Sequence, residues 1–529
     1  MEENFTIHEP SLTTLKELDA SVSSLLLGHI HLDSRQLKEN DVFVAIQGSQ
    51  HHGMNYLASA LKQLVAVVIS DRDLTNDEQV LLDSQIKPPR VIVLPNLEGV
   101  LGKLASWFYS YPSRKIKVVG ITGTNGKTSS AFFTAQLLDE MQQRVALIGT
   151  LGNGPLDDLQ NSINTTPDAI TVHRMLREFI EQGMQWCVME VSSHALSLGR
   201  VQGVEFESVA MTQITRDHID FHGTEKAYRE AKKRLFTDYQ SKHKIINIAD
   251  ETGVVLAKQL QNENAKSQIA ATNNLIIYNA NANNKNLLNK SEQQSLLERN
   301  LFLSVKEVEY GALGIFCDYE VNQRIQKIHI PLMGGFNVEN CFCALSILLA
   351  AGFDLNRVNS LLSNLKNVQG RMQLVNQQPT VLIDFAHTPD ALEKLLQAIK
   401  THLSASNARL TLVFGCGGDR DKGKRPLMGA IAEKFADKVV LTSDNPRTED
   451  PLTIIADIRQ GFTSEEGCLV VENREQAILE ALSQSSLDEI IIIAGKGHED
   501  YQDINGVKIP FSDESIVRSW AQTKELEQH

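Results

Sequence analysis

Cysteine is scarce in this chain, with six residues among 529, and no two of them have the C-x-x-C spacing of metal or redox motifs. This scarcity predicts buried free thiols in a reducing compartment and argues against disulfides and a zinc site. Long apolar runs are also lacking, since no run reaches the roughly 18 residues that a membrane span needs. The acidic start Met1-Glu2-Glu3-Asn4 has no apolar segment of a secretory signal. These absences predict a cytoplasmic protein.

Basic residues are outnumbered, with 51 Lys and Arg against 65 Asp and Glu, which gives a formal net charge of −14. This balance argues against a nucleic-acid partner, so any phosphate site must be a local basic pocket. The length predicts roughly three domains of about 150 residues each. The hydrophobic fraction of 42% is enough for ordinary globular cores.

Three regions of different texture follow one another. Residues 1–112 carry short strands and helical stretches and end at the linker Tyr111-Pro112-Ser113. In residues 113–369 apolar strands alternate with helical patterns, and residues 370–529 repeat this alternation. The alternation favours an α/β protein with doubly wound, mostly parallel sheets, whose ligands bind beyond the carboxyl ends of the strands. The expected strands are 41–46, 65–69, 91–94, 117–122, 145–149, 186–191, 208–214, 244–248, 381–384, 410–414, 438–442 and 490–494.

One segment interrupts the alternation. Residues 260–300 contain Asn-rich stretches such as Asn279-Ala280-Asn281-Ala282-Asn283-Asn284. Polar, low-complexity composition of this kind is typical of a flexible surface insertion. We therefore expect an insertion within the central domain rather than a binding segment.

A glycine-rich loop, Gly120-Ile121-Thr122-Gly123-Thr124-Asn125-Gly126-Lys127-Thr128, follows the apolar run 116–119 and opens an expected helix over 129–141. This is the layout of a nucleotide phosphate loop, although Ile121 stands at the first glycine position of the strict pattern. Gly123 and Gly126 still permit the tight backbone path. We predict that backbone N–H groups cradle phosphates, Lys127 offsets their charge and Thr128 holds Mg²⁺. The alternative is an ordinary strand–helix turn.

Further motifs surround this loop in a fixed order. They are Asn164-Thr165-Thr166-Pro167-Asp168, Met189 to Leu196, Thr215 to Gly223, Ala231-Lys232-Lys233-Arg234-Leu235-Phe236, Gly335 to Asn340, Gly370-Arg371-Met372, Asp384 to Leu392, Gly415 to Met428, Asp444-Asn445-Pro446-Arg447 and Gly495-Lys496-Gly497-His498-Glu499. In this order, from Asp33 to about Asp513, the chain resembles the Mur ligase family. The resemblance implies an N-terminal uridine-binding α/β domain, a central P-loop ATPase domain and a C-terminal Rossmann-like domain.

The resemblance also implies an activity. Within the family the motifs are most similar to those of ATP-dependent ligases that add meso-2,6-diaminopimelate to UDP-N-acetylmuramoyl-L-alanyl-D-glutamate in peptidoglycan precursor synthesis. We accordingly expect a monomer that binds these small molecules, ATP and Mg²⁺. Ligases that add L-lysine and folylpolyglutamate-synthase-like ligases are the alternative enzymes. A nucleotide-switch binding protein is the alternative of another class, and it would need no second substrate pocket.

Several residues are expected at the ATP and metal site. Glu190 follows the apolar run 186–189 and ends the expected strand at the carboxyl edge of the sheet. A carboxylate at this edge suits Mg²⁺. The alternative is that Glu190 caps a helix or is simply solvated. The resemblance implies that His218 helps to hold a second Mg²⁺ and that Lys232 is carbamylated by CO₂, which requires a neutral amine. Without the resemblance, Lys232 and Lys233 form a basic helix face, and Lys233 is expected to be ordinary. The implied ATP contacts are Thr122, Gly123, Thr124, Asn125, Gly126, Lys127, Thr128, Asn247, Asn340 and Arg371, with Asp384 and His387 facing the same cleft.

The resemblance places the nucleotide-sugar substrate between the first two domains. Its uridine-side contacts are Leu32, Ser34, Ser49, Gln50 and His51. Its muramoyl-peptide contacts are Asn164, Thr165, Thr166, Ser192, Leu198 and Arg200. Leu198 departs from the family, which usually has glutamine there, and leucine donates no hydrogen bond; Ser197 is a candidate substitute.

The amino-acid substrate is expected in the third domain. Diaminopimelate carries an ammonium and a carboxylate at each end, and guanidinium groups bind carboxylates with two parallel hydrogen bonds. Arg420 and Arg447 are therefore the predicted carboxylate contacts, and Glu499 suits an ammonium. The remaining members of the expected pocket are Asp444, Asn445, Pro446 and Gly495. Asn-Pro also favours a turn, and a turn can carry a site.

Overall fold

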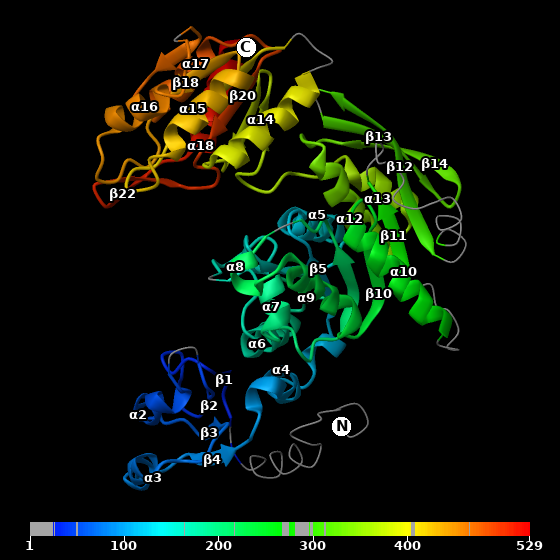
Figure 1. The fold of residues 1–529 in the computed structure, drawn as a ribbon, viewed down its shortest axis with the longest axis vertical. Helices are drawn as coiled ribbons and strands as arrows, with labels where there is room; N and C mark the ends of the chain where they lie inside the picture. Colours follow the sequence, from blue (N-terminus) through cyan, green and yellow to red (C-terminus); the bar gives the residue numbers. More distant parts are fainter. Residues whose placement is uncertain are drawn as a thin grey trace. The chain divides into compact units, whose positions relative to one another are not determined.

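The computed structural model describes residues 25–528 except 26, 49–50, 163, 216, 267–274, 281–295, 297–299, 312–313, 404–407 and 465. The chain forms two compact units. The first contains the described residues through Ile277 together with Ser346–Gly352, and the second contains Leu301–Leu345 and the described residues from Phe353 onward. Both units contain helices and strands, and in the second unit three strands, β12 to β14, follow one another (Figure 1).

The first unit begins with a small parallel sheet whose strands lie in the order β1-β2-β3-β4. Apolar side chains of its two faces pack against α2, α3 and α4, because the fully buried strands β2 and β3 are apolar throughout their length except for Ser70. Strands β2 to β4 agree with three predicted strands. The elements are β1 (Ile30–His31), β2 (Val42–Ala45), η1 (Gly53–Tyr56), α2 (Leu57–Lys62), β3 (Val67–Ser70), α3 (Asn76–Asp83), β4 (Arg90–Val93), α4 (Leu97–Phe108) and η2 (Pro112–Arg114).

The central sheet of the first unit runs in the order β11-β10-β9-β5-β8-β6-β7. Strand β5 pairs in parallel with β8 on one side and β9 on the other, and the register sets Ile121 beside Glu190. The glycine loop, residues 120–128, therefore emerges at the same sheet edge as the end of β8. The elements are β5 (Lys117–Thr122), α5 (Lys127–Glu140), β6 (Val145–Gly149), β7 (Gly152–Pro155), α6 (Ala169–Glu181), β8 (Trp186–Glu190), α7 (Ser193–Ser197), β9 (Phe206–Met211), α8 (Ile219–His222), α9 (Glu225–Thr237), β10 (Ser241–Asn247), α10 (Glu251–Lys266) and β11 (Leu275–Asn279).

The second unit contains an antiparallel meander and a C-terminal sheet. The meander is β12 (Leu301–Gly311), β13 (Gly314–Val321) and β14 (Arg324–Ile330), followed by α12 (Phe336–Ala350) and α13 (Leu355–Leu362). The C-terminal sheet has the order β15-β16-β20-β17-β18-β19 and is parallel except for β15. Its strands are β15 (Gln373–Gln377), β16 (Thr380–Asp384), β17 (Leu410–Phe414), β18 (Lys438–Leu441), β19 (Cys468–Val470) and β20 (Ile490–Ala494).

Two helical layers cover the C-terminal sheet (Figure 1). Alternate side chains of β16, β17 and β20 pack with α14 (Pro389–Leu403), α15 (Lys424–Phe435) and α16 (Pro451–Arg459) on one face. The other set packs with α17 (Arg474–Ser483) and α18 (Asp513–Gln528). A separate hairpin, β21 (Tyr501–Ile504) and β22 (Val507–Pro510), follows β20. The doubly wound arrangement confirms the predicted α/β class.

The structure corrects three expectations. Residues 260–300 are not one surface insertion, because α10 extends to Lys266 and Leu275–Tyr278 are buried in β11; most of the Asn-rich stretch lies outside the described residues. The expected strand–helix alternation fails at the meander, and the hairpin was not predicted.

The predicted free thiols are confirmed: all six cysteines are free and five are buried. In the described part, no helix is long and apolar enough to cross a membrane.

Candidate active site

The glycine loop has a backbone that only glycine follows without strain at two points. Gly123 has φ +155° and Gly126 has φ +83°, and a Cβ on Gly123 would overlap the Thr212 hydroxyl. Gly126 is the residue before α5, so the loop leads directly into the helix N-terminus, where unpaired N–H groups favour an anion. The Thr122 hydroxyl at the start of the loop is buried and has no hydrogen-bond partner among the described residues.

Two lysines converge on one carbonyl of this loop. Lys127 Nζ donates to Gly123 O at 2.9 Å and to Thr124 O at 3.0 Å, and Lys232 Nζ, on α9, donates to Gly123 O at 2.7 Å. Burial lowers the pKa of Lys127, and burial together with the neighbouring Lys127 charge brings the pKa of Lys232 well below its ordinary value. Lys232 also lies 4.9 Å from the centroid of the Tyr228 ring. Lys232 is thus disposed toward the neutral amine.

A hydroxyl and a carboxylate meet beside the lysines. Thr128, in the first turn of α5, donates its hydroxyl to Glu190 Oε2 at 2.8 Å. Thr150 N donates to Glu190 Oε1 at 2.8 Å, and the Thr150 hydroxyl lies 3.4 Å from Oε2. Burial raises the pKa of Glu190. Thr128 and Glu190, each predicted as a Mg²⁺ contact, therefore lie side by side.

Four of the predicted muramoyl-peptide contacts gather around the end of β8. Thr166 donates its hydroxyl to the carbonyl of Glu190 at 2.8 Å and accepts from Ser192 N at 3.1 Å. Arg200 Nη1 donates to Thr166 O at 2.9 Å, and the Thr165 hydroxyl lies 3.2 Å from that of Thr150. The threonines, Ser192 and Arg200 therefore lie next to the Glu190 strand end.

Two other predicted contacts of this substrate lie more openly. Asn164 is exposed, and its carbonyl accepts from the Ser162 hydroxyl at 2.6 Å. Leu198 follows α7 and is 53% exposed, with the exposed Ser197 before it. An exposed leucine at this position neither packs in the core nor donates a hydrogen bond.

His218 lies at the entrance of α8 with φ +49°, and its Nε2 is 3.4 Å from Asp217 Oδ2. Its ring packs edge-on against His194 at 4.8 Å between centroids and lies 6.3 Å from Tyr228. Tyr228 OH is 2.8 Å from the Thr124 hydroxyl. His218 is thus connected to the glycine loop through Tyr228, and Arg216 beside it lies outside the described residues.

The predicted nucleotide contacts fall in both units, and each has its own surroundings. In the first unit, buried Asn247 accepts from Ala249 N at 2.9 Å. In the second unit, Asn340 Nδ2 lies 3.2 Å from Asn337 Oδ1, and exposed Arg371 lies 6.0 Å from the centroid of the Phe385 ring.

Asp384 and His387 follow the end of β16. Asp384 accepts from Met372 N at 2.8 Å and from Ala386 N at 2.7 Å, and burial raises its pKa. The ring of exposed His387 binds Phe385 O at 2.8 Å. Asp384 therefore organises its own turn, while His387 points to the surface.

Three of the predicted uridine-side contacts, Leu32, Ser34 and His51, lie in loops next to strands of the N-terminal sheet. Ser34 is buried, Leu32 is half-buried and His51 is exposed. Ser49 and Gln50 lie outside the described residues.

Beside the C-terminal sheet, the buried side chains Asp444, Asn445 and Lys496 gather with half-buried Glu499, and we term this group the polar cluster. Asn445 Nδ2 donates to Glu499 Oε2 at 2.7 Å, and Lys496 Nζ lies 3.2 Å from the same oxygen. Burial raises the pKa of Asp444. Three predicted amino-acid contacts are thus brought together. Gly495, with φ +113°, is beside them, since its Cβ would meet Asp444.

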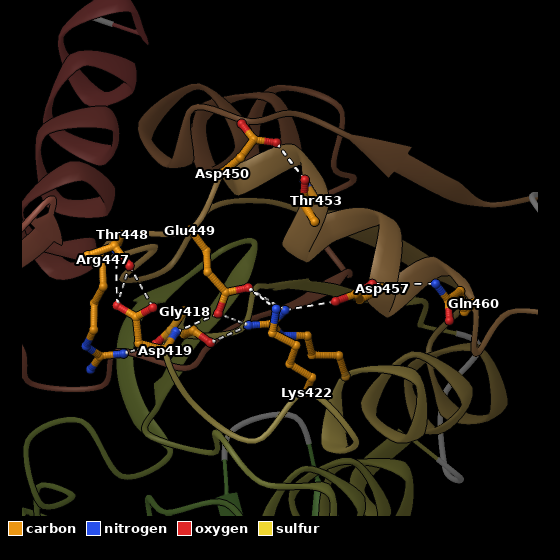
Figure 2. A network of polar contacts seen from close by, with 12 residues as sticks. Gly418, Asp419, Lys422, Arg447, Thr448, Glu449, Asp450, Thr453, Asp457 and Gln460 are labelled. Carbon is orange, nitrogen blue, oxygen red and sulfur yellow. Dashed lines mark hydrogen bonds and ion pairs between the residues drawn. The ribbon is translucent and has the colours of Figure 1, made fainter.

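Arg447 follows Pro446, and two loops hold it in place. Arg447 has φ +51°, and its N–H donates to Asp503 O at 2.9 Å, next to the hairpin. Its Nη1 donates to Gly418 O at 2.7 Å, which ties it to the loop that bears exposed Arg420 (Figure 2). Its Nε lies 3.7 Å from Asp503 Oδ2, and because guanidinium has five donors, the remaining N–H groups of Arg447 can serve a carboxylate of the substrate.

A carboxylate links the same two loops (Figure 2). Glu449 accepts from Asp419 N at 2.6 Å and pairs with buried Arg425 at 2.9 Å and with Lys422 at 3.1 Å. Arg425 also pairs with Asp457 at 2.8 Å. The loops of Arg420 and Arg447 are therefore joined by an ion-pair network, which we term the loop clamp.

Comparison with known proteins decides the family. The model of the Mur ligase middle domain matches residues 121–348, and that of the Mur ligase glutamate ligase domain matches residues 370–497. A UDP-N-acetylmuramoyl-L-alanyl-D-glutamate–2,6-diaminopimelate ligase of Haemophilus ducreyi is 40% identical over 96% of this chain and 99% of its own length. The chain belongs to the Mur ligase family.

Solved structures agree with the assignment of this chain to the Mur ligase family. A structure of a UDP-N-acetylmuramoyl-L-alanyl-D-glutamate–2,6-diaminopimelate ligase is 34% identical, with a TM-score of 0.71 over 94% of this chain and 95% of that chain. A folylpolyglutamate synthase of Thermotoga maritima is 15% identical, with a TM-score of 0.53 over 74% of this chain and 89% of that chain. The second likeness shows the fold alone.

The residues of this Mur ligase suit Mg²⁺ and nucleotide phosphates. Mg²⁺ prefers oxygen ligands and is usually held by one or two protein groups together with phosphates and waters. Thr128 and Glu190 place a hydroxyl and a carboxylate 2.8 Å apart at a helix N-terminus, below two lysine amines. The hydroxyl of Thr128 and the carboxylate of Glu190 therefore suit Mg²⁺, and the lysine amines suit nucleotide phosphates.

Two residues of the Mur ligase sites escaped the sequence reasoning. Lys496 lies in the motif Gly495-Lys496-Gly497-His498-Glu499, and it is fully buried in the polar cluster. Lysine is normally a surface residue. Glu449 follows the Asp444-Asn445-Pro446-Arg447 motif and holds the loop clamp. No local pattern marks either, because each is defined by partners distant in the sequence.

Proposed function

We propose that this Mur ligase joins meso-2,6-diaminopimelate to UDP-N-acetylmuramoyl-L-alanyl-D-glutamate at the expense of ATP, in peptidoglycan precursor synthesis. The observation that carries the proposal is the convergence of Lys127 and Lys232 on Gly123 O beside the Thr128–Glu190 pair. The proposed substrates are those in the names of relatives that are similar to this chain over nearly its whole length.

The reaction forms an amide from a carboxylate, which is a poor electrophile. The substrate carboxylate first attacks the γ-phosphorus of ATP, and ADP leaves. The amine then attacks the acyl phosphate, and the tetrahedral intermediate expels phosphate. Because ATP and a carboxylate repel each other, the site needs fixed positive charge, which Lys127 supplies at the β- and γ-phosphates. Thr128 and Glu190, with His218 for a second ion, hold the Mg²⁺ that offsets the remaining charge.

Lys232 acts as a carbamate in this proposal. Its amine attacks CO₂ and loses a proton, which gives an anion in place of an ammonium. The reaction needs the neutral amine that burial and Lys127 favour at this position. When formed, the carbamate on Lys232 would supply anionic oxygens for Mg²⁺ beside the acyl phosphate.

The other substrate contacts follow the family pattern. The loop residues Thr122 to Gly126 bind phosphates, and Asn247, Asn340 and Arg371 bind the rest of the nucleotide. The muramoyl peptide lies against Thr165, Thr166, Ser192 and Arg200, which gather at the end of β8. The complete proposed set for this substrate is Leu32, Ser34, Ser49, Gln50, His51, Asn164, Thr165, Thr166, Ser192, Leu198 and Arg200.

The amino-acid substrate binds in the third domain. Arg447 and Arg420 receive the distal carboxylate, and Glu499 receives an ammonium, with Asp444, Asn445, Pro446 and Gly495 completing the pocket. L-Lysine lacks the distal carboxylate, so a site built around these arginines favours diaminopimelate. A folylpolyglutamate-synthase-like activity is disfavoured because that fold match covers only 74% of this chain.

The organisation of the protein is part of the proposal. The domains are residues 1–112, 113–369 and 370–529, and the protein works as a monomer in the cytoplasm, where its nucleotide substrates are found.

The test is phosphate release from ATP in the presence of both substrates, with each component omitted in turn. Turnover must require ATP, Mg²⁺, UDP-N-acetylmuramoyl-L-alanyl-D-glutamate and meso-diaminopimelate together. Equal turnover with L-lysine would point to the lysine-adding ligases. Nucleotide hydrolysis without the other substrates would favour a nucleotide switch.

A further inference from the structure

The proposed function gives Lys496 no role, although its position is unusual. The side chain is 0% exposed, in the loop that follows β20. Its Nζ lies 3.1 Å from Asn445 Oδ1, 3.2 Å from Glu499 Oε2 and 3.8 Å from Asp444 Oδ1. Three residues proposed to bind the amino-acid substrate thus face one buried ammonium.

Lys496 fixes which way the Asn445 amide points. An ammonium only donates hydrogen bonds, so it must face the amide oxygen. Asp503 N donates to that same oxygen at 2.9 Å. The amide nitrogen is therefore directed to Glu499 Oε2, to which it donates at 2.7 Å.

The same contacts fix Glu499. Its Oε2 accepts from both Asn445 and Lys496, so the carboxylate cannot rotate without breaking two bonds to buried donors. Within the described part of the chain, these bonds leave Oε1 for another donor. The cluster holds two carboxyl groups, Asp444 and Glu499, and the nearby buried Arg474 interacts with both but is itself paired with Asp513. Lys496 therefore leaves one carboxylate that a further cation can complement.

We propose that Lys496 is a positioning residue that holds Glu499 and Asn445 in the orientation that receives an ammonium group of the amino-acid substrate. It acts through these two side chains and does not contact the substrate. The inference rests on the proposed function, because it concerns the same amino-acid pocket. It adds a residue on which recognition of the ammonium depends.

The experiment compares Lys496→Met, Glu499→Gln and the double variant by steady-state kinetics of phosphate release. Methionine keeps the length of the side chain and removes the ammonium. The matched control is Lys508→Met, because Lys508 Nζ lies 4.0 Å from the Tyr501 ring centroid and Lys496 Nζ lies 5.6 Å from it, while Lys508 is on the exposed strand β22. Thermal unfolding of every variant is measured in parallel.

We expect Lys496→Met to raise the KM for diaminopimelate by about 10- to 100-fold, because a buried charged partner of the binding residue is lost. The KM values for ATP and for the UDP-sugar substrate should stay within about twofold, and Lys508→Met should match the wild type. In the Glu499→Gln background, adding Lys496→Met should raise the KM for diaminopimelate clearly less than it does in the wild type, because the part of its effect that acts through Glu499 is already lost and only the part through Asn445 remains.

An unchanged KM for diaminopimelate in Lys496→Met would overturn the inference. So would a double variant in which the two effects multiply, since Lys496 would then act independently of Glu499. If Lys496→Met does not fold, the comparison of Glu499→Gln with the double variant decides alone, because that pair removes both charges together. Failure of the proposed function is distinct: the wild type itself would then show no turnover that depends on diaminopimelate.

Discussion

The glycine loop and the polar cluster both gather charged side chains, but they treat their lysines differently. At the glycine loop, Lys127 and Lys232 donate to backbone carbonyls. In the polar cluster, Lys496 lies within 3.8 Å of two carboxyl groups. The first site presents the charge of Lys127 without a bonded anion, whereas in the second site the ammonium of Lys496 already faces carboxyl groups.

This difference matches the ligands proposed for the two sites. A polyphosphate brings a large negative charge, so its site gains from cations that are not already paired. A zwitterionic amino acid brings both signs, so its site needs charges whose positions are fixed before binding. The comparison predicts that removing a charge is most harmful at the glycine loop and more selective at the polar cluster.

The largest loss of turnover is expected when Lys127 is replaced. Lys127→Ala removes the charge nearest the phosphates, and turnover should fall by at least about 10²–10³-fold, because preorganised electrostatic contacts are worth that much. The fold should persist, since the lysine bonds only loop carbonyls. Phosphate release with all substrates is the measurement, and Lys242→Ala, a surface lysine paired with Glu207, is the control. Near-normal turnover in Lys127→Ala would refute the phosphate-loop interpretation.

Lys232→Ala should be nearly inactive, with a loss of at least about 10²-fold. Added short carboxylic acids should restore part of the activity, because they replace the carbamate anion. The matched control is Lys233→Ala, which loses only a surface pair with Glu230 at 2.7 Å and should be close to neutral. Intact mass of the active wild type that shows an unmodified Lys232 would contradict the carbamate proposal.

The third effect concerns selectivity and belongs to Arg447. With L-lysine bound, Arg447 would keep only Asp503, 3.7 Å from its Nε, as a carboxylate partner. Because Arg447 is partly exposed and Arg420 is exposed, solvent screens the loss of the substrate carboxylate, which costs about 1.5–3 kcal/mol. Since each 1.4 kcal/mol is about tenfold, we expect preference for meso-diaminopimelate over L-lysine by about 10- to 10²-fold. Arg447→Ala should raise the KM for diaminopimelate steeply and change that for ATP little. Comparable kcat/KM of the wild type with L-lysine would show that carboxylate recognition does not set the selectivity.

The two regions also differed in how far the sequence predicted them. The predicted strand 117–122 coincides with β5, and the predicted helix starts within two residues of α5. Loop, strand and helix are contiguous, so one local pattern defines the phosphate loop. Glu190 could be added because strand ends of a parallel sheet share an edge.

The polar cluster depends on contacts that no local pattern specifies. Its hydrogen bonds join residues more than 50 positions apart, such as Asn445 and Lys496. The hairpin beside Arg447 did carry a signal, since Asn505-Gly506 between two short strands, with φ +52° and +78°, is a typical hairpin turn. The buried strand β11 was similarly visible as the apolar run Leu275–Tyr278, but the neighbouring asparagines obscured it.

A smaller effect is expected from the loop clamp. Hydrogen bonding to Arg425 lowers the pKa of Glu449 to about 2. Because the folded pKa lies below the unfolded value, Glu449 stabilises the protein above about pH 4.3, and this stability is lost as the pH falls toward 2. Glu449→Gln should therefore lower the free energy of unfolding at pH 7 by about 1–2 kcal/mol, discounted because the pair is near solvent.

The matched variant for the clamp is Asp457→Asn, which removes the other partner of Arg425 without touching the Arg420 loop. Both variants should lose stability, but only Glu449→Gln should also raise the KM for diaminopimelate. Denaturant unfolding at several pH values and substrate kinetics measure the two. Equal KM values in both variants would mean that the clamp supports the fold without placing the arginines.

The smallest expected change in the free energy of unfolding has the opposite sign, and it concerns Glu190 beside the glycine loop. Burial raises the pKa of Glu190, so its charge is held in the folded state at a cost that grows as the pH rises above about 4.3 and levels off beyond the folded pKa. Glu190→Gln should abolish ligase turnover yet raise the free energy of unfolding near pH 8 by on the order of 1 kcal/mol, since neutral groups often replace buried charges favourably. Below about pH 4 the difference should vanish, because the carboxyl is then protonated in both states. Thus a carboxylate proposed for chemistry should destabilise the fold at neutral pH, whereas Glu449 should stabilise it. A loss of stability in Glu190→Gln at pH 8 would show that the bonds to Thr128 and Thr150 outweigh desolvation.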